Sequence, residues 1–334
     1  MRNFLRIFLF LFIVPLILFQ LRGLAIAGGD SDWIVLLVER PLYFFFRAPL
    51  VIAFHRMLWL VLGRFGWSPA DCVSLSSSLA GGFFFLALFR ISRNWRAWLP
   101  ILVSCLPLLF IGHRETYAWP YALTLWCFYL MREHLKGRVG PFPVYAVLLV
   151  ATFAHPMVLM IWPGLAWSLS PWTQEKLKPL LLTFVLTFLL MILLLIFGKA
   201  GGLPQRMWVL PLFEIGDTLT RYPLFSWIHW KELGWFYLVS MPVGAILFVP
   251  LALSEWKGWK GGILVTALLT LTWSVVWHPG MSYADWDLFA WPGLFVNLAV
   301  GLAWSERAAT GSLGSCCDGQ NEKSPPERFS DGDF

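Results

Sequence analysis

Acidic, basic and histidine side chains gather in a few short stretches that interrupt long apolar runs. The first is GGDSDW, residues 28 to 33, where Asp30 and Asp32 follow two glycines. A carboxylate here could act as a general base or supply oxygen ligands to a divalent cation. The same residues also suit a solvated turn, because Asp and Gly favour turn geometry. The stretch therefore has a catalytic and a structural interpretation, and either aspartate could be the base.

The second polar stretch is GHRETY, residues 112 to 117, which lies between two apolar runs. A charge at bilayer depth costs at least a few kcal/mol, so ionisable residues near membrane spans are often paired or functional. Arg114 and Glu115 could neutralise each other at a helix end. Alternatively, His113 or Arg114 binds a phosphate while Glu115 orients a hydroxyl or a metal ion.

The third stretch is HPGMSYADWD, residues 278 to 287, which precedes the last apolar run. Asp285 could be a helix N-cap or a favourable partner of the helix dipole. His278 and the pair Asp285 and Asp287 also suit a binding site. Together with Asp30 and Glu115, Asp287 is a candidate ligand for a divalent cation such as Mg²⁺ or Mn²⁺.

Two lone histidines lie outside these stretches. His155 and His229 each stand beside apolar or aromatic residues. Each is either an interface residue that packs between helices or a ligand of the same site.

The composition determines the class of protein. The 334 residues are 58% hydrophobic and 13% charged, with a mean hydropathy of +0.69, which leaves too little polar surface for a soluble globule. The net charge of +6 does not indicate a nucleic-acid partner, because basic residues in a membrane protein first report its topology. The five cysteines follow neither a disulfide nor a metal-binding pattern.

These features predict an all-α polytopic bundle with about ten membrane spans. The first apolar run resembles a signal-peptide core, but we interpret it as a retained helix. Residues 142 to 170 form either two short spans or one broken helix. The predicted spans are residues 4–21, 71–90, 97–112, 117–131, 142–154, 157–170, 178–197, 233–253, 261–277 and 286–304.

The apolar segment of residues 49 to 63 is left out of the spans. His55 and Arg56 lie in its middle, which suits an amphipathic helix along the membrane interface. With this segment outside the membrane, the short basic loops all fall on the side of Arg2 and Arg6. The positive-inside rule then places both termini in the cytoplasm.

The opposite, extracytoplasmic side receives the three polar stretches and five of the six histidines. Long loops hold polar residues in any case, but a shared cavity explains the distribution better. The long loop of residues 198 to 232 carries Arg206 and Arg221 among aromatic residues that suit a membrane interface. This loop could cover a lipid-linked substrate or simply connect two helices.

The order of these stretches resembles the GT-C superfamily of membrane glycosyltransferases, in which an acidic residue follows the first helix and interfacial helices come next. The resemblance covers residues 1 to 304. Besides GDSDW and its continuation, it depends on FIGHRETYAWP, ATFAHPMVLMIWPGL, LFSWIHWKELGWFYLVSMP and HPGMSYADWDLFAW.

The resemblance implies a transferase that takes a sugar from a polyprenyl phosphate or diphosphate on the outer face of a bacterial inner membrane. The loop acid of the superfamily maps onto Asp30, with Asp32 as the alternative. An inverting transfer needs such a carboxylate to accept the proton of the attacking hydroxyl. The leaving phosphate needs cations, for which Arg114, Arg206 and Arg221 are candidates. The chain lacks the sizeable soluble domain of the larger members.

Two other classes remain open. A transporter or lipid flippase would also bury charged residues, although we see neither mid-span charges nor repeat symmetry. A non-catalytic membrane subunit would explain the hydrophobicity alone. The tail of residues 305 to 334 is rich in Gly, Ser, Pro and charge, which predicts a disordered cytoplasmic segment.

Overall fold

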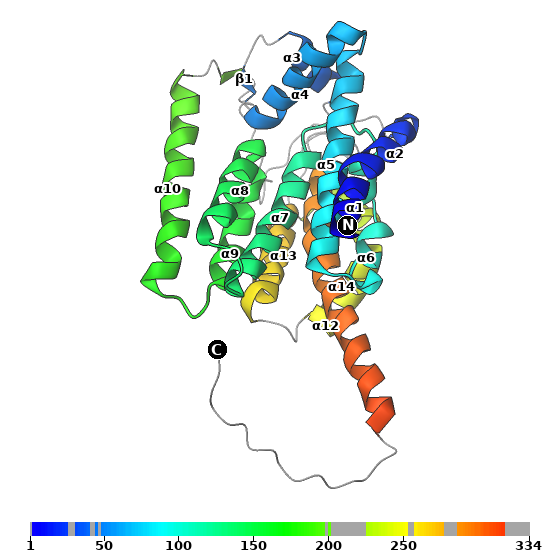
Figure 1. The fold of residues 1–334 in the computed structure, drawn as a ribbon, viewed down its shortest axis with the longest axis vertical. Helices are drawn as coiled ribbons and strands as arrows, with labels where there is room; N and C mark the ends of the chain where they lie inside the picture. Colours follow the sequence, from blue (N-terminus) through cyan, green and yellow to red (C-terminus); the bar gives the residue numbers. More distant parts are fainter. Residues whose placement is uncertain are drawn as a thin grey trace.

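A computed structural model gives the fold of the chain (Figure 1). It describes residues 2–25, 31–40, 44–45, 48–197, 200–201, 225–252, 257–276 and 286–317. Five of the predicted site residues lie outside these ranges: Asp30, Arg206, Arg221, His278 and Asp285.

The first apolar run forms one long helical segment from Phe4 to Leu24. It consists of α1 (Arg2–Phe8), a π-helical turn (Leu9–Ile13), α2 (Val14–Gln20) and a 3-10 turn (Leu21–Leu24). The π-helical turn directly precedes Pro15, which has no N–H group and crowds the preceding turn. The 21 residues are long enough to cross a bilayer, as predicted for the first span.

Two short helices lie at one end of the bundle, at the top of Figure 1. They are α3 (Ser31–Glu39) and α4 (Pro49–Leu62). With 14 residues, α4 is shorter than the ~20 residues that a span needs. Its Val51 and His55 are buried while other apolar side chains are exposed, which suits the predicted interfacial position. Near it, the two-residue strand β1 (Phe44–Phe45) pairs in parallel with β2 (Ala200–Gly201).

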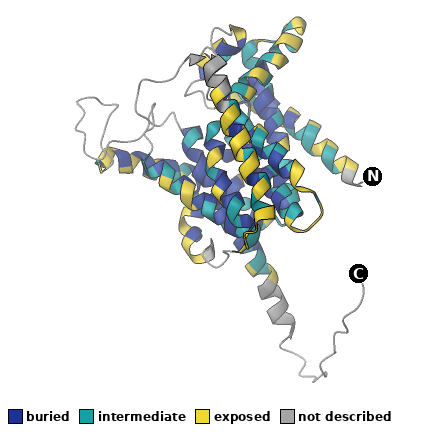
Figure 2. Ribbon diagram, turned by 90° about the vertical axis from the view of Figure 1, so that its left-hand side faces the viewer, coloured by how far each residue is buried: buried dark blue, intermediate teal, exposed yellow. Residues whose placement is uncertain are grey.

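Three long helices connect the two ends of the bundle: α5 (Pro69–Ile91), α7 (Ala118–Leu135) and α14 (Trp286–Cys317). Helices α5 and α7 pack side by side. Helix α7 contacts α14 through the aromatic pairs Tyr121–Trp291 and Phe128–Phe295. Figure 2 shows many buried residues along the centre of the bundle. At one end the Tyr121 hydroxyl donates to the carbonyl of Asp287, at 2.8 Å. At the other end the Asn94 side chain, just after α5, reaches the carbonyl of Ser305.

The predicted span of residues 97 to 112 is not a continuous helix. The segment contains a 3-10 turn (Trp95–Ala97), α6 (Leu99–Leu102) and a second 3-10 turn (Leu106–Phe110). Pro100 and Pro107 interrupt the helical hydrogen bonds. The irregular backbone is covered by neighbours, and the amide of Cys105 donates to the carbonyl of Val239 at 2.8 Å. Such backbone is tolerated at membrane depth only where protein surrounds it.

The segment of residues 142 to 170 forms two helices separated by a 3-10 turn, so both predicted forms, two short spans and one broken helix, stay open. Helix α8 (Pro141–Ala154) ends at His155, and a 3-10 turn (Pro156–Ile161) leads into α9 (Trp162–Ser168). Helix α10 (Gln174–Phe197) follows.

The predicted span of residues 233 to 253 is not one continuous helix. The chain forms α11 (Trp227–Ser240) and α12 (Pro242–Ala252), which meet at an angle of 91°. Met241 between them has φ −149° and ψ 53°, outside the helical region, and it precedes a proline. The pair is either a broken span or a re-entrant loop.

Long apolar helices mark the chain as a membrane protein. Four described helical segments are long and apolar enough to cross a bilayer, or five if the bent pair counts as one. The fold is therefore a helical bundle, whereas the prediction of about ten spans is not confirmed. The four segments are Phe4–Leu24, Pro69–Ile91, Gly258–Val276, which belongs to α13, and Trp286–Ala309.

Helix α14 continues to Cys317, beyond residue 304 where the last span was predicted to end. Two contacts hold this extension: Lys260 pairs with Glu306, and the guanidinium of Arg307 donates to the carbonyl of Pro250 at 2.9 Å. Residue 305, where the composition predicted the start of a disordered tail, therefore lies inside a helix. Residues 318 to 334 lie outside the described residues.

Candidate functional site

A buried pair of side chains joins the second and third polar stretches. His113 Nε2 lies 2.9 Å from Asp287 Oδ2, and the two side chains are only 3% and 4% exposed. This distance is that of a hydrogen bond between the ring nitrogen and the Asp287 side chain. Its other oxygen, Oδ1, accepts from the amide of Leu288 at 2.8 Å. The carboxylate is thus fixed in orientation at the start of α14.

The loop that carries His113 is held by the first turns of α5. The Ser74 hydroxyl donates to the carbonyl of Gly112 at 2.8 Å, and the Ser77 hydroxyl donates to the carbonyl of His113. Gly112 has φ +69°, a conformation that favours glycine. A Cβ atom at this position would also overlap Arg22, so the loop depends on glycine here.

Aromatic residues surround the pair. The Tyr121 hydroxyl on α7 donates to the backbone carbonyl of Asp287, and the Trp286 ring centroid lies 5.2 Å from that of His113. Among the described residues, the buried Nε1–H of Trp286 has no hydrogen-bond partner. A buried donor without a partner loses the free energy of its hydrogen bond to water, so it is suited to a ligand oxygen.

A second contact brings the first polar stretch to the same place. The Ser31 hydroxyl donates to Glu115 Oε1 at 3.4 Å, and both residues are buried. Asp32 is exposed next to this contact, while Asp30 lies outside the described residues. The structure therefore brings together parts of all three stretches, which are far apart in the sequence.

Arg114 stands between the two contacts. It is half-buried, and it forms neither a hydrogen bond nor an ion pair with any residue that the structure describes. The predicted neutralisation of Arg114 by Glu115 is therefore not observed. A guanidinium without a carboxylate partner is available for an anion.

We call Ser31, His113, Arg114, Glu115, Trp286 and Asp287 the polar cluster. All of these residues except Arg114 are buried, and the cavity expected around them stays a prediction.

The two lone histidines hold backbone segments together. His155 Nδ1 accepts from the amide of Met157 at 3.2 Å and so caps the 3-10 turn after α8. Its ring also packs on Tyr117, with centroids 5.2 Å apart. His229 Nε2 lies 2.7 Å from the carbonyl of Val275, to which it donates across α11 and α13. These contacts favour the interface interpretation of both residues over the ligand interpretation.

The described residues alone do not form a metal site. They contain no group of three His, Cys, Asp or Glu side chains with the spacing of a metal centre. Both oxygens of Asp287 already accept hydrogen bonds, which suits a fixed carboxylate better than a metal ligand. The proposed cation site of Asp30, Glu115 and Asp287 includes one residue outside the described part of the chain.

The sequence analysis overlooked several residues of this region. Ser31 lies between Asp30 and Asp32, and Trp286 lies between Asp285 and Asp287, but only the aspartates were selected. Ser74 and Ser77 belong to SLSSS, a serine-rich run inside an otherwise apolar helix. Serines in an apolar helix usually hydrogen-bond to backbone, so this run was the available signal.

A comparison of the chain with protein-family models, curated proteins and solved structures finds no match.

Proposed function

We propose that the protein is an integral membrane glycosyltransferase of the GT-C type. It would move a sugar from a polyprenyl-phosphate donor to an acceptor outside the cytosol. The observation that carries this proposal is the 3.4 Å contact of Ser31 with Glu115, because it places the acidic first stretch against the second polar stretch. The pair of His113 and Asp287 adds the third stretch to the same cluster.

The chemistry assigns a different role to each group. Asp30, or Asp32 as the alternative, takes the proton of the acceptor hydroxyl as its oxygen attacks the anomeric carbon. The bond between that carbon and the donor phosphate oxygen breaks, and the phosphate leaves with the electron pair. The Arg114 guanidinium stabilises the phosphate charge, and the Trp286 N–H donates to a sugar or phosphate oxygen. No step is assigned to a metal ion.

Glu115 and the pair of His113 and Asp287 act as positioning residues. Glu115 accepts from Ser31 and so holds the first loop on the cluster. Asp287 orients the imidazole of His113. Arg114 is the next residue along the chain, so the same contact helps to position its backbone. Loss of either contact would displace the reacting groups, and a displacement of about 1 Å can reduce a rate 10²-fold.

The proposed membrane topology follows from which helices and loops lie at each end of the bundle. We propose ten passages, in which broken or bent segments count with the long helices. The interfacial helices α3 and α4 lie at the end with the polar cluster, and the arginine-rich loops lie at the other end. The positive-inside rule places the arginine end in the cytosol and the polar cluster outside it. Both termini are then cytoplasmic.

The test is transfer from radiolabelled polyprenyl-phosphate sugars by the purified protein, with membrane extract as the source of acceptors. We expect Asp30→Asn or Asp32→Asn to abolish transfer, according to which is the base. Glu115→Gln should retain a reduced rate. Asp71→Asn is the matched control, because Asp71 is a half-exposed carboxylate that pairs with Arg22 outside the cluster. Absence of transfer from every donor would remove the proposal.

One observation favours a second candidate, a transporter or flippase. The 91° bend between α11 and α12 resembles the discontinuous helices that line transport sites. A fluorescent lipid-linked sugar in proteoliposomes separates the two functions. A transporter moves this lipid between leaflets without breaking the bond between sugar and phosphate, whereas the transferase releases polyprenyl phosphate.

A further inference from the structure

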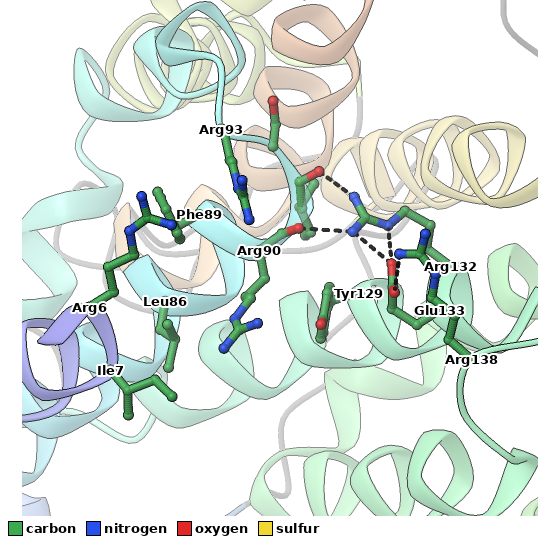
Figure 3. Close-up of a pocket in the computed structure, with 12 residues that line it drawn as sticks. Arg6, Ile7, Leu86, Phe89, Arg90, Arg93, Tyr129, Arg132, Glu133 and Arg138 are labelled. Atoms are coloured by element: carbon green, nitrogen blue, oxygen red, sulfur yellow. Dashed lines mark hydrogen bonds and ion pairs between the residues drawn. The ribbon is translucent and has the colours of Figure 1, made fainter. Parts of the chain in front are cut away.

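A cavity of about 480 Å³ lies at the opposite end of the bundle from the polar cluster (Figure 3). It is formed where the last turn of α5 meets the end of α7 and the end of α1. Arginine is the commonest residue in its lining, and the five arginines are Arg6, Arg90, Arg93, Arg132 and Arg138.

Two of these arginines share the one acid of the lining, Glu133. Arg132 Nη2 lies 2.8 Å from Glu133 Oε1, and Arg138 Nη1 lies 3.1 Å from Oε2. Burial alone would raise the pKa of Glu133, but the hydrogen bonds and charges of the two arginines outweigh it and lower the pKa. Arg132 also donates to the carbonyl of Arg90 at 2.9 Å and to that of Ile91, which satisfies the end of α5. These two guanidinium groups therefore have structural partners.

The other three arginines do not. Within the described chain, the side chains of Arg6, Arg90 and Arg93 form no hydrogen bond or ion pair. Arg6 only stacks over Phe89, 5.4 Å from the ring centroid. Figure 3 shows these three side chains on one side of the cavity, apart from the network of Arg132, Glu133 and Arg138.

Three like charges around one cavity repel each other, and no carboxylate of the lining compensates them. A bound anion would relieve this repulsion. Phosphate is the anion that arginine recognises best, because the planar fork of donors matches two phosphate oxygens. The hydroxyl groups of Ser92 and Tyr129 also line the cavity and can donate to further oxygens.

The rest of the lining is apolar. Ile7, Leu86 and Phe89 lie beside the arginines. The neighbouring helix α1 exposes large apolar side chains, including Phe4 and Leu5. A basic pocket between helices, with an apolar wall next to lipid, fits the headgroup and upper chain of an anionic lipid.

We propose that this cavity binds a phosphate group through Arg6, Arg90 and Arg93, as a second ligand site that is separate from the polar cluster. The phosphate belongs to a lipid headgroup or to a soluble diphosphate, and the experiment distinguishes these sources.

The test measures binding of two probes to the full-length protein in dodecyl maltoside by titration calorimetry. The probes are pyrophosphate and dihexanoyl phosphatidic acid, with dihexanoyl phosphatidylcholine as the reference. The test variant is the double substitution Arg90→Gln, Arg93→Gln. The control is Arg64→Gln, Arg96→Gln, which removes the same charge from arginines that do not line the cavity.

We expect at least one phosphate probe to bind the native protein. The test variant should bind it roughly 10- to 30-fold more weakly, and the control should bind it within about twofold of the native affinity. Binding of pyrophosphate indicates a soluble diphosphate, whereas binding of phosphatidic acid alone indicates a lipid headgroup. Absence of binding for both probes, or equal weakening in both double variants, overturns the proposal. If the test variant does not fold, Arg93→Glu replaces it, because Arg93 is exposed and its reversal leaves the core intact.

Discussion

Breaking the pair of His113 and Asp287 should destabilise the protein in a way that a double-mutant cycle can measure. The two side chains are almost fully buried and 2.9 Å apart. Removing one partner leaves the other buried polar group unsatisfied, which costs about 1–3 kcal/mol, and more where that group is charged. We therefore expect this loss of unfolding free energy for His113→Ala and for Asp287→Ala.

The double variant His113→Ala, Asp287→Ala should lose less unfolding free energy than the two single variants lose in total. A hydrogen bond to a charged group contributes about 1.5–3 kcal/mol, whereas side-chain hydrogen bonds within membrane proteins average only ~0.6 kcal/mol. If His113 donates to an ionised Asp287, the coupling energy should fall in the higher range. The coupling energy therefore reports whether the pair is charge-assisted.

The assay is unfolding of the purified protein in mixed micelles by sodium dodecyl sulfate, followed by circular dichroism. His134→Ala is the matched histidine control, because His134 is partly exposed at the other end of α7 and its ring hydrogen-bonds to the backbone carbonyl of Val139. It should cost less than about 1.5 kcal/mol. A coupling energy of ~0.6 kcal/mol or less would refute a charge-assisted hydrogen bond between His113 and Asp287.

Three further predictions concern other parts of the bundle. Gly164→Ala should cost about 1–3 kcal/mol of unfolding free energy, because its Cβ would overlap Thr266 where α9 crosses α13; Gly234→Ala, with open space around it, should not destabilise. His55→Leu should stabilise the protein, because both buried ring nitrogens lack partners in the described chain and burial lowers the pKa of His55 to about 3. This advantage should grow as the pH falls below 6.5, where only the unfolded histidine gains a proton. Glu133→Gln should destabilise the protein at neutral pH. The pKa of the folded Glu133 carboxylate lies below its ordinary 4.5, so the difference in unfolding free energy between the variant and the native protein should shrink as the pH falls through this lowered pKa. Chemical unfolding at several pH values checks the last two predictions. The unfolding free energy of the native protein should change with pH differently from that of His55→Leu and from that of Glu133→Gln.

Much of the arrangement could be predicted from composition and the order of polar stretches. Long apolar runs separated by charged loops predict a helical membrane bundle, which is confirmed. His55 and Arg56 in the middle of the segment that forms α4, and the distribution of the basic loops, also argued against a span. These features are local, because hydrophobicity and charge act directly on the segment that carries them.

The helix breaks were harder to predict, because they depend on neighbouring helices. Pro100 and Pro107 prevent a regular helix, but only the surrounding protein makes such backbone tolerable. The contact between Cys105 and Val239 that helps to satisfy it joins residues far apart in the chain. An apolar run with prolines therefore predicts a membrane-embedded segment better than it predicts whether that segment is a continuous helix.

The site was predicted at the level of stretches and not of individual contacts. The sequence analysis selected His113, Glu115 and Asp287, which the structure places in one polar cluster. It could not assign their partners, because the hydrogen bond of Ser31 and the stacking of Trp286 depend on how α3, α7 and α14 pack. It also left the arginine loops as topology signals, although their convergence forms the cavity.

The most direct test of the account is the side of the membrane on which each end of the bundle lies. Asp32→Cys and Arg138→Cys each place a thiol at an exposed position, one beside the polar cluster and the other beside the arginine cavity. Each is made in a chain whose native cysteines are replaced by serine, and is labelled in intact cells with a membrane-impermeant maleimide. The account predicts labelling of the cysteine at position 32 in intact cells, and of the cysteine at position 138 only after permeabilisation. Equal labelling of both positions in intact cells would contradict it.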